Sequence, residues 1–179
     1  MTRKAPFPLS LLLPVLLAAC GTQDPLYRIG VADYGRGLAL EAPFVYGRTD
    51  TLAGDPLRAA RAARDVEGFA YLLESDPLWQ TTRNGTLQPQ MQIARRELRA
   101  ALGMPDAVPS DVAAARFGAA LEALAANNLP AARDVLTPLA GPGTLDRLSA
   151  LPRLRRVEEA AAAMAAEASQ SRNPGSGRG

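Results

Sequence analysis

The side chains that most often do chemistry in proteins are nearly absent from this chain. Its 179 residues include a single cysteine, Cys20, and no histidine. The lack of histidine removes the commonest general base, the usual catalytic triads and most zinc, copper and non-haem iron sites. Any reaction would have to depend on carboxylates, hydroxyl groups or arginine, and we expect neither a bound metal nor another cofactor.

Cys20 stands directly after an apolar run near the N-terminus. Arg3 and Lys4 form a short basic start, the apolar run covers residues 9–19, and small residues precede the cysteine. This three-part layout is typical of a secretory signal. The run is too short for a transmembrane helix, since a helix crossing about 30 Å of hydrocarbon needs about 20 apolar residues.

Leu17-Ala18-Ala19-Cys20 resembles the lipobox of bacterial lipoproteins. The resemblance implies that residues 1–19 are a signal peptide that is removed, and that Cys20 is the lipidation site, with palmitate or a similar acyl chain. Two or three acyl chains would anchor the protein stably in a lipid bilayer, because each buried methylene adds about 0.8 kcal/mol. An acylated sulfur leaves no thiolate nucleophile and no disulfide partner.

Gly21 follows the cysteine and bears on the choice of membrane. In enteric-type sorting, an aspartate at this position retains a lipoprotein in the inner membrane. The resemblance therefore implies a cell-envelope protein that is anchored in the outer membrane and faces the periplasm if the cell is Gram-negative.

The charge of the mature chain gives no reason to expect a nucleic-acid partner. The chain has 20 Lys plus Arg and 18 Asp plus Glu, and Arg3 and Lys4 would leave with the signal peptide. The remaining charges balance, and nucleic-acid binding needs a clustered basic face.

Glu74-Ser75 follows a predicted helix and resembles the catalytic Glu-Ser pair of lytic transglycosylases. The resemblance implies an envelope glycan hydrolase in which Glu74 is the general acid and base, a role that needs a half-buried carboxylate in a concave pocket. The Gly- and Gln-rich motifs of that family are absent. The other interpretation is a solvated charge at a helix end.

Two further carboxylate pairs are candidate metal ligands by composition alone. They are Asp106 with Asp111 and Glu158 with Glu159. Neither pair has the regular oxygen-ligand spacing of a calcium loop. We interpret both as helix-cap and surface charges.

A mature chain that begins at Cys20 is long enough for one domain with its own core. We expect a mainly α fold, a single helical-bundle domain of about five helices over residues 55–168. Cap residues and apolar spacing place the helices. The predicted ranges are 56–75, 87–102, 111–126, 130–139 and 152–168, with a shorter helix at 144–150. Residues 169–179 lack large apolar side chains and are predicted to be a disordered tail.

Residues 20–54 are predicted to hold the lipidated cysteine and an extended, aromatic-rich segment, with a short strand or hairpin, that packs on the helices. The many glycines argue against a long helix, and the aromatic residues argue against a disordered tether. Tyr34-Gly35-Arg36 and Tyr46-Gly47-Arg48 repeat one tripeptide, which we interpret as two turns; the alternative is a pair of matched ligand-binding corners.

Residues 117–139 resemble a tetratricopeptide-type helical hairpin, but the turn is short and no second copy follows. An ordinary pair of antiparallel helices explains the pattern equally well.

The sequence as a whole thus predicts a lipid-anchored envelope protein. Its expected role is that of a non-enzymatic scaffold or binding module that acts on another envelope protein, a lipid or the cell wall, with the Glu74 glycan hydrolase as the alternative.

Overall fold

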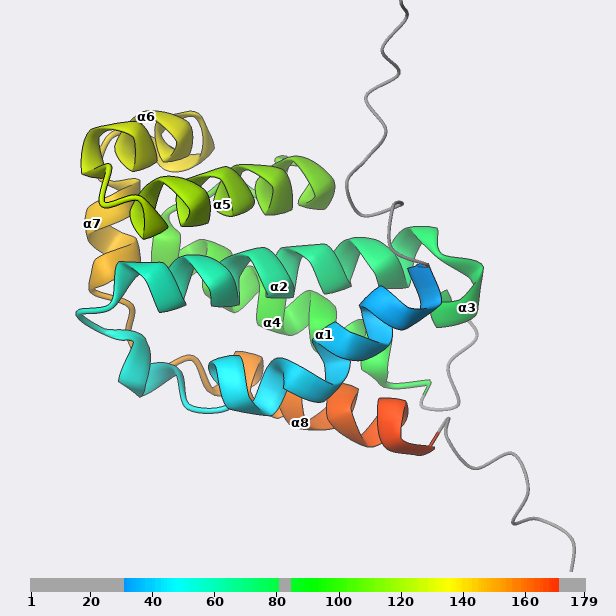
Figure 1. The fold of residues 1–179 in the computed structure, drawn as a ribbon. Helices are drawn as coiled ribbons and strands as arrows, with labels where there is room; N and C mark the ends of the chain where they lie inside the picture. Colours follow the sequence, from blue (N-terminus) through cyan, green and yellow to red (C-terminus); the bar gives the residue numbers. More distant parts are fainter. Residues whose placement is uncertain (1–30, 81–84, 171–179) are drawn as a thin grey trace, which may run out of the picture.

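The computed structural model describes residues 31–80 and 85–170, and these form a mainly α-helical bundle without a strand. The elements, labelled as in Figure 1, are α1 (Val31–Tyr46), a 3₁₀ turn η2 (Thr49–Leu52), α2 (Pro56–Ser75), α3 (Pro77–Gln80), α4 (Leu87–Leu102), α5 (Ser110–Ala125), α6 (Leu129–Ala140), α7 (Thr144–Ser149) and α8 (Arg155–Gln170). The predicted helical-bundle domain is confirmed, with more helices than the five expected.

The longest helix, α2, lies at the centre of the bundle. It packs against α5 on one side and against α1 and α4 on the other, and α8 covers α1 and α4 (Figure 1). Its predicted inner face is buried, including Val66, Phe69 and Leu73. Asp55 caps the helix, because its carboxylate accepts a hydrogen bond from the backbone N–H of Arg58 at 3.0 Å.

The helices predicted from caps and apolar spacing lie within a few residues of the observed bounds. Gly103 ends α4 in the left-handed conformation, with φ of 66°, as expected for a C-terminal glycine. Asn128 caps α6, and its side chain accepts a hydrogen bond from the N–H of Ala131 at 3.1 Å. The short connection between α5 and α6 makes these helices packed neighbours, as predicted.

The extended segment predicted over residues 20–54 is wrong from residue 31 onward. Residues 31–46 form helix α1, and residues 49–52 form a 3₁₀ turn. The first Tyr-Gly-Arg tripeptide lies inside α1 and is not a turn, whereas the second lies at the C-terminal end of the helix. Residues 20–30, including Cys20, lie outside the described part of the chain.

Tertiary packing explains why α1 is helical despite its glycines. Leu38, Ala39, Ala42 and Tyr46 recur at helical spacing and are buried against α2 and α8. The cost of glycine in a helix is about 0.5–1 kcal/mol, which this buried face offsets. The expectation that the segment packs on the helices is therefore correct, although its conformation is not extended.

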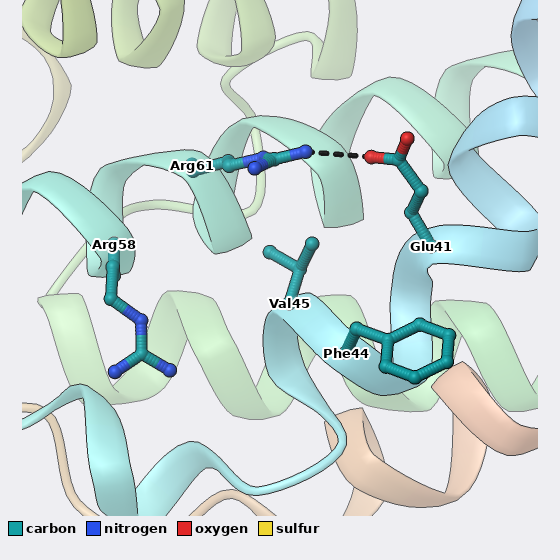
Figure 2. Close-up of a pocket in the computed structure, with 5 residues that line it drawn as sticks. All are labelled: Glu41, Phe44, Val45, Arg58 and Arg61. Carbon is teal, nitrogen blue, oxygen red and sulfur yellow. Dashed lines mark hydrogen bonds and ion pairs between the residues drawn. The ribbon is translucent and has the colours of Figure 1, made fainter.

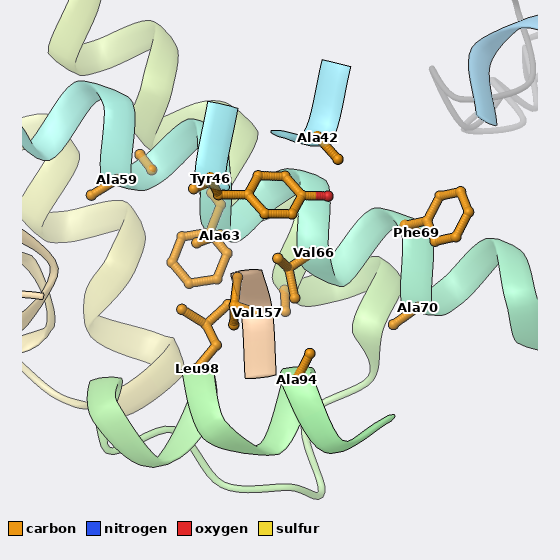
Figure 3. Packing of buried hydrophobic residues seen from close by; sticks show 14 of the residues in the cluster. Ala42, Tyr46, Ala59, Ala63, Val66, Phe69, Ala70, Ala94, Leu98 and Val157 are labelled. Atoms are coloured by element: carbon orange, nitrogen blue, oxygen red, sulfur yellow. The ribbon is translucent and has the colours of Figure 1, made fainter. Parts of the chain in front are cut away.

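One hydrophobic core runs through the described residues. Figure 3 shows side chains from α1, α2, α4 and α8 meeting in its centre, with Tyr46, Val66, Leu98 and Val157 close together. Many of the remaining contacts come from alanines such as Ala63, whose small side chains let the helices approach closely. The core continues to Phe117 on α5, Leu136 on α6 and Leu148 on α7.

Gly35 on α1 makes a close approach that a larger residue would prevent. A Cβ atom at this position would overlap the indole of Trp79 and lie 3.2 Å from Leu72 Cδ1, whereas a Cβ atom at Gly37 would meet nothing within 4 Å. We expect Gly35→Ala to destabilise the fold by about 1–3 kcal/mol, as overpacking does. Gly37→Ala is expected to stabilise it by about 0.5–1 kcal/mol because alanine favours the helix.

Urea unfolding followed by circular dichroism measures both variants under one condition. The two substitutions are chemically identical and lie on the same helix, so opposite signs would locate the effect in the contact with Trp79. Equal stabilisation by both variants would contradict this packing.

Candidate functional site

A cavity of about 440 Å³ lies between α1 and α2 and is the candidate site in the described residues. It is lined by Glu41, Phe44 and Val45 from α1 and by Arg58 and Arg61 from α2. In Figure 2, Val45 lies between Arg58 at one end and Glu41 and Phe44 at the other. The cavity thus combines an apolar wall with charged groups at its ends.

The buried face of α1 determines how Phe44 and Val45 are presented. Tyr46 is fully buried, and its hydroxyl donates a hydrogen bond to Met164 Sδ of α8 at 3.6 Å. Ala42 is also fully buried. Phe44, between these two positions, turns away from the core and is 87% exposed, whereas Val45 is half-buried and packs against the edge of the core.

The two arginines of the cavity differ in their partners. Arg61 forms an ion pair with Glu41, with 2.6 Å between Nη2 and Oε2, and lies 3.9 Å from the carboxylate of Asp65. The guanidinium of Arg58 donates only long hydrogen bonds to Thr51, at 3.4 Å to its carbonyl and 3.5 Å to its hydroxyl. Arg58 therefore presents a cation whose contacts in the described residues are with neutral oxygen atoms.

A buried carboxylate lies beneath the charged side of the cavity. Burial raises the pKa of Asp65, and the nearby guanidinium groups of Arg64 and Arg61 partly oppose that shift. Arg64 donates two hydrogen bonds to Asp65 Oδ1, at 2.8 and 2.7 Å. Burial also raises the pKa of the Tyr46 phenol, with a further contribution from the negative charge of Asp65. The α1–α2 junction thus holds Arg61 from both sides, through Glu41 and Asp65.

A second charged cluster lies deep between α2 and α4. Arg99 pairs with Glu67 through two hydrogen bonds of 2.7 and 2.6 Å, and both side chains are almost fully buried. Arg99 also donates to the carbonyl oxygens of Pro105 and Asp106 and to Ser110 Oγ. These contacts tie the loop before α5 to the core, so the cluster holds the fold together and has no access for a ligand.

Glu74 lies at the exposed C-terminal end of α2 and does not line the cavity. Its carboxylate side chain is 42% exposed, accepts a hydrogen bond from Gln92 Nε2 at 2.5 Å and lies 3.9 Å from Arg95 Nη1. Ser75 donates its hydroxyl proton to the carbonyl of Tyr71 in the preceding turn. Glu74 therefore presents a partly exposed carboxylate that lies outside the cavity and has Gln92 and Arg95 as partners.

Of the remaining candidate carboxylates, Glu158 and Glu159 both pair with arginines of the same chain segment. Glu158 accepts hydrogen bonds from the backbone and hydroxyl of Thr49 and from Arg153, and its pKa is lowered chiefly by the hydrogen bond from Arg153. Glu159 pairs with Arg156 at the surface. Over residues 31–80 and 85–170, no group of His, Cys, Asp or Glu side chains is arranged to hold a metal ion.

The sequence did not point to the cavity residues. Phe44 and Val45 fall within the segment predicted to be extended, and Arg58 and Arg61 are ordinary helix-surface residues by pattern. A helical interpretation of residues 31–46 would have supplied the signal, because Phe44 falls outside the apolar stripe of Leu38, Ala42 and Tyr46.

No helix in the described part of the chain is both long and apolar enough to cross a membrane. The chain as a whole matches no family model, no curated protein and no solved structure.

Proposed function

We propose that this chain is a lipid-anchored protein of the bacterial cell envelope whose helical domain is a non-enzymatic binding module. The observation that carries the anchor is Leu17-Ala18-Ala19-Cys20 at the end of an N-terminal apolar run. Removal of residues 1–19 would leave Cys20 as the acylated first residue, with the domain held beside the bilayer. In a Gram-negative cell, Gly21 favours the outer membrane, with the domain in the periplasm.

The cavity between α1 and α2 supports the binding role. Its volume falls within the range of about 300–1,000 Å³ that ligand sites occupy, and it joins apolar side chains to a few charged ones. A solvent-exposed Phe44 at its rim is a side chain of the kind that is enriched at the centres of protein interfaces. Together these features favour a partner-binding module over a catalyst, and an envelope protein is the partner we expect.

Intact mass spectrometry of the native, membrane-extracted protein tests the anchor. We expect a mature chain that begins at Cys20 and carries two or three acyl chains. A Cys20→Ala variant should be left unprocessed or should no longer fractionate as a lipid-anchored protein, because each lost chain removes about 0.8 kcal/mol per buried methylene.

A Ser10→Ala variant of the signal region is the matched control, since it leaves Cys20 intact and should be processed normally. An unmodified thiol at Cys20 in the native protein would overturn the proposal, and a free cysteine would then have to be explained in other terms.

A further inference from the structure

We propose that the cavity between α1 and α2 binds an acidic peptide segment of a partner protein, with an apolar side chain of the peptide against Phe44 and Val45 and a peptide carboxylate on Arg58. This inference rests on the proposed binding-module function and names the chemistry of the partner. Each part of it follows from one feature of the cavity.

The apolar contact follows from the exposure of Phe44. Phe44 is 87% exposed, whereas Tyr46, two residues later on the same helix, is fully buried. Exposed aromatic rings that adjoin a depression are the usual anchors of protein interfaces, because they bury a large apolar area with few rotatable bonds. Val45 lies in the same wall and extends the apolar surface into the cavity (Figure 2).

The carboxylate contact follows from the state of Arg58. Among residues 31–80 and 85–170, its guanidinium makes only long hydrogen bonds to neutral oxygens of Thr51, so a carboxylate could replace them with shorter, charge-assisted ones. Arg61, by contrast, is held by Glu41 and Asp65. The charge of Arg61 is therefore compensated by its own carboxylate partners, and Arg58 is the group that recognises the anion.

The shape and charge favour a peptide over a bilayer surface. A recessed space of about 440 Å³ accepts protruding side chains, whereas a bilayer surface meets the parts of a protein that project. Because Glu41 already pairs with Arg61, the cavity offers one arginine, Arg58, to an anion, whereas attraction to a bilayer of anionic lipids needs a cluster of basic residues. A single extended chain can place its carboxylate at the Arg58 end and keep it away from Glu41 at the other end (Figure 2).

Fluorescence anisotropy with a dye-labelled probe peptide tests the proposal. The probe is Gly-Ser-Leu-Asp-Phe-Glu-Ser-Gly, and it is titrated with the full chain in mild detergent. Matched probes replace both acids by their amides, both acids by lysine, or both apolar residues by serine. We expect saturable binding of the acidic, apolar probe and binding at least about tenfold weaker for each matched probe, as the loss of a charge-assisted contact or of an aromatic anchor produces.

Variants of the protein locate the binding. Arg58→Gln and Phe44→Ser should each weaken the acidic probe about tenfold, and Arg58→Lys should restore part of the affinity. Arg96→Gln and Leu129→Ser are controls on α4 and α6, away from the cavity. The first makes the same change at an exposed arginine, and the second replaces another exposed large apolar residue by serine. Both controls should bind like the unaltered chain.

Three results would overturn the inference. The first is that the acidic and amide probes bind equally well. The second is that the cavity variants and the control variants change the affinity for the acidic probe by the same factor. The third is that the probe peptide does not bind, while the chain binds vesicles of phosphatidylglycerol and phosphatidylethanolamine in a way that requires Arg58 and Phe44. The Cys20→Ala chain, titrated in parallel, separates the two proposals. This chain should bind the probe as the unaltered chain does. If Cys20 proves not to be acylated, the probe-binding result is unaffected, and if the probe does not bind, the evidence for acylation is unaffected.

Discussion

Replacing Arg99 by methionine is expected to lower the free energy of unfolding by about 3–5 kcal/mol, the usual cost of breaking a buried ion pair by removing one partner. Both side chains of the pair are almost fully buried, so the substitution leaves the carboxylate of Glu67 in the core without a compensating charge. It also leaves the carbonyl oxygens of Pro105 and Asp106 without the hydrogen bonds that Arg99 donates. Urea unfolding, followed by circular dichroism, measures the change as a lower midpoint.

The control is Arg156→Met, which breaks an exposed ion pair with Glu159 on α8. Both partners of that pair are more than half exposed, so its loss should cost only about 0–1 kcal/mol. A double variant, Glu67→Leu with Arg99→Met, removes both buried charges together and should regain most of the stability that Arg99→Met loses.

The double variant decides between two accounts of the cluster. If Arg99→Met lowers the free energy of unfolding because it leaves the charge of Glu67 uncompensated, replacing Glu67 as well should restore most of the lost stability. If the double variant is as unstable as Arg99→Met alone, the stabilisation would come instead from the bonds of Arg99 to the loop before α5. A cost of Arg99→Met no larger than that of Arg156→Met would contradict the burial of the pair.

Local signals were sufficient to predict most of the helices. Asp55 and Pro56 begin α2, Asp76 and Pro77 end it, and Gly103 ends α4, each through the conformation of a few neighbouring residues. Such signals need no knowledge of distant contacts. The bundle was therefore predictable from residue 55 onward.

Helix α1 was not predictable in the same way, because tertiary contacts and not local signals make these residues helical. Gly35 argues against a helix by propensity, but in the structure it lets α1 approach Trp79 of α3. Leu38, Ala42 and Tyr46 form a helical stripe only if the two glycines before them and Pro43 between them are accepted as helical. Packing against α2 and α8 decided the conformation, as it commonly does where propensity is weak.

The candidate site depended on that helix and so could not be predicted. The cavity exists only where the C-terminal half of α1 lies against α2, which brings Glu41 to Arg61. The pairing of Glu67 with Arg99 could not be predicted either, because the sequence around each residue does not indicate which residue is its partner. Glu74 belongs to a recognisable sequence motif but does not line the cavity. Arg58 belongs to no motif and lines it.

Phe69→Ala is expected to destabilise the fold by about 3–5 kcal/mol, as truncation of a buried phenylalanine does. The ring of Phe69 is fully buried and packs edge-to-face on Trp79, with centroids 4.8 Å apart and an angle of 71°. Trp79 in turn fills the space that Gly35 leaves on α1. Loss of the Phe69 ring therefore removes the support of a contact that joins α1, α2 and α3.

Two measurements separate this account from a simple loss of apolar area. Urea unfolding gives the change in stability, and the emission of Trp79, which is the only tryptophan of the chain, reports its surroundings in the folded state. The folded Phe69→Ala variant should emit at longer wavelength than the unaltered protein because the indole becomes more accessible to water. Phe69→Leu keeps much of the volume and should cost clearly less than Phe69→Ala.

Phe44→Ala is the matched control, since it truncates the same side chain on the exposed rim of the cavity. It should change stability by less than about 0.5 kcal/mol, as surface substitutions do, and should leave the emission of Trp79 unaltered. Similar costs for the two truncations would mean that Phe44 is covered in the folded protein, which would remove the exposed ring on which the peptide-binding inference depends. The contrast between two phenylalanines, one inside the bundle and one at its surface, thus tests the core and the candidate site in one experiment.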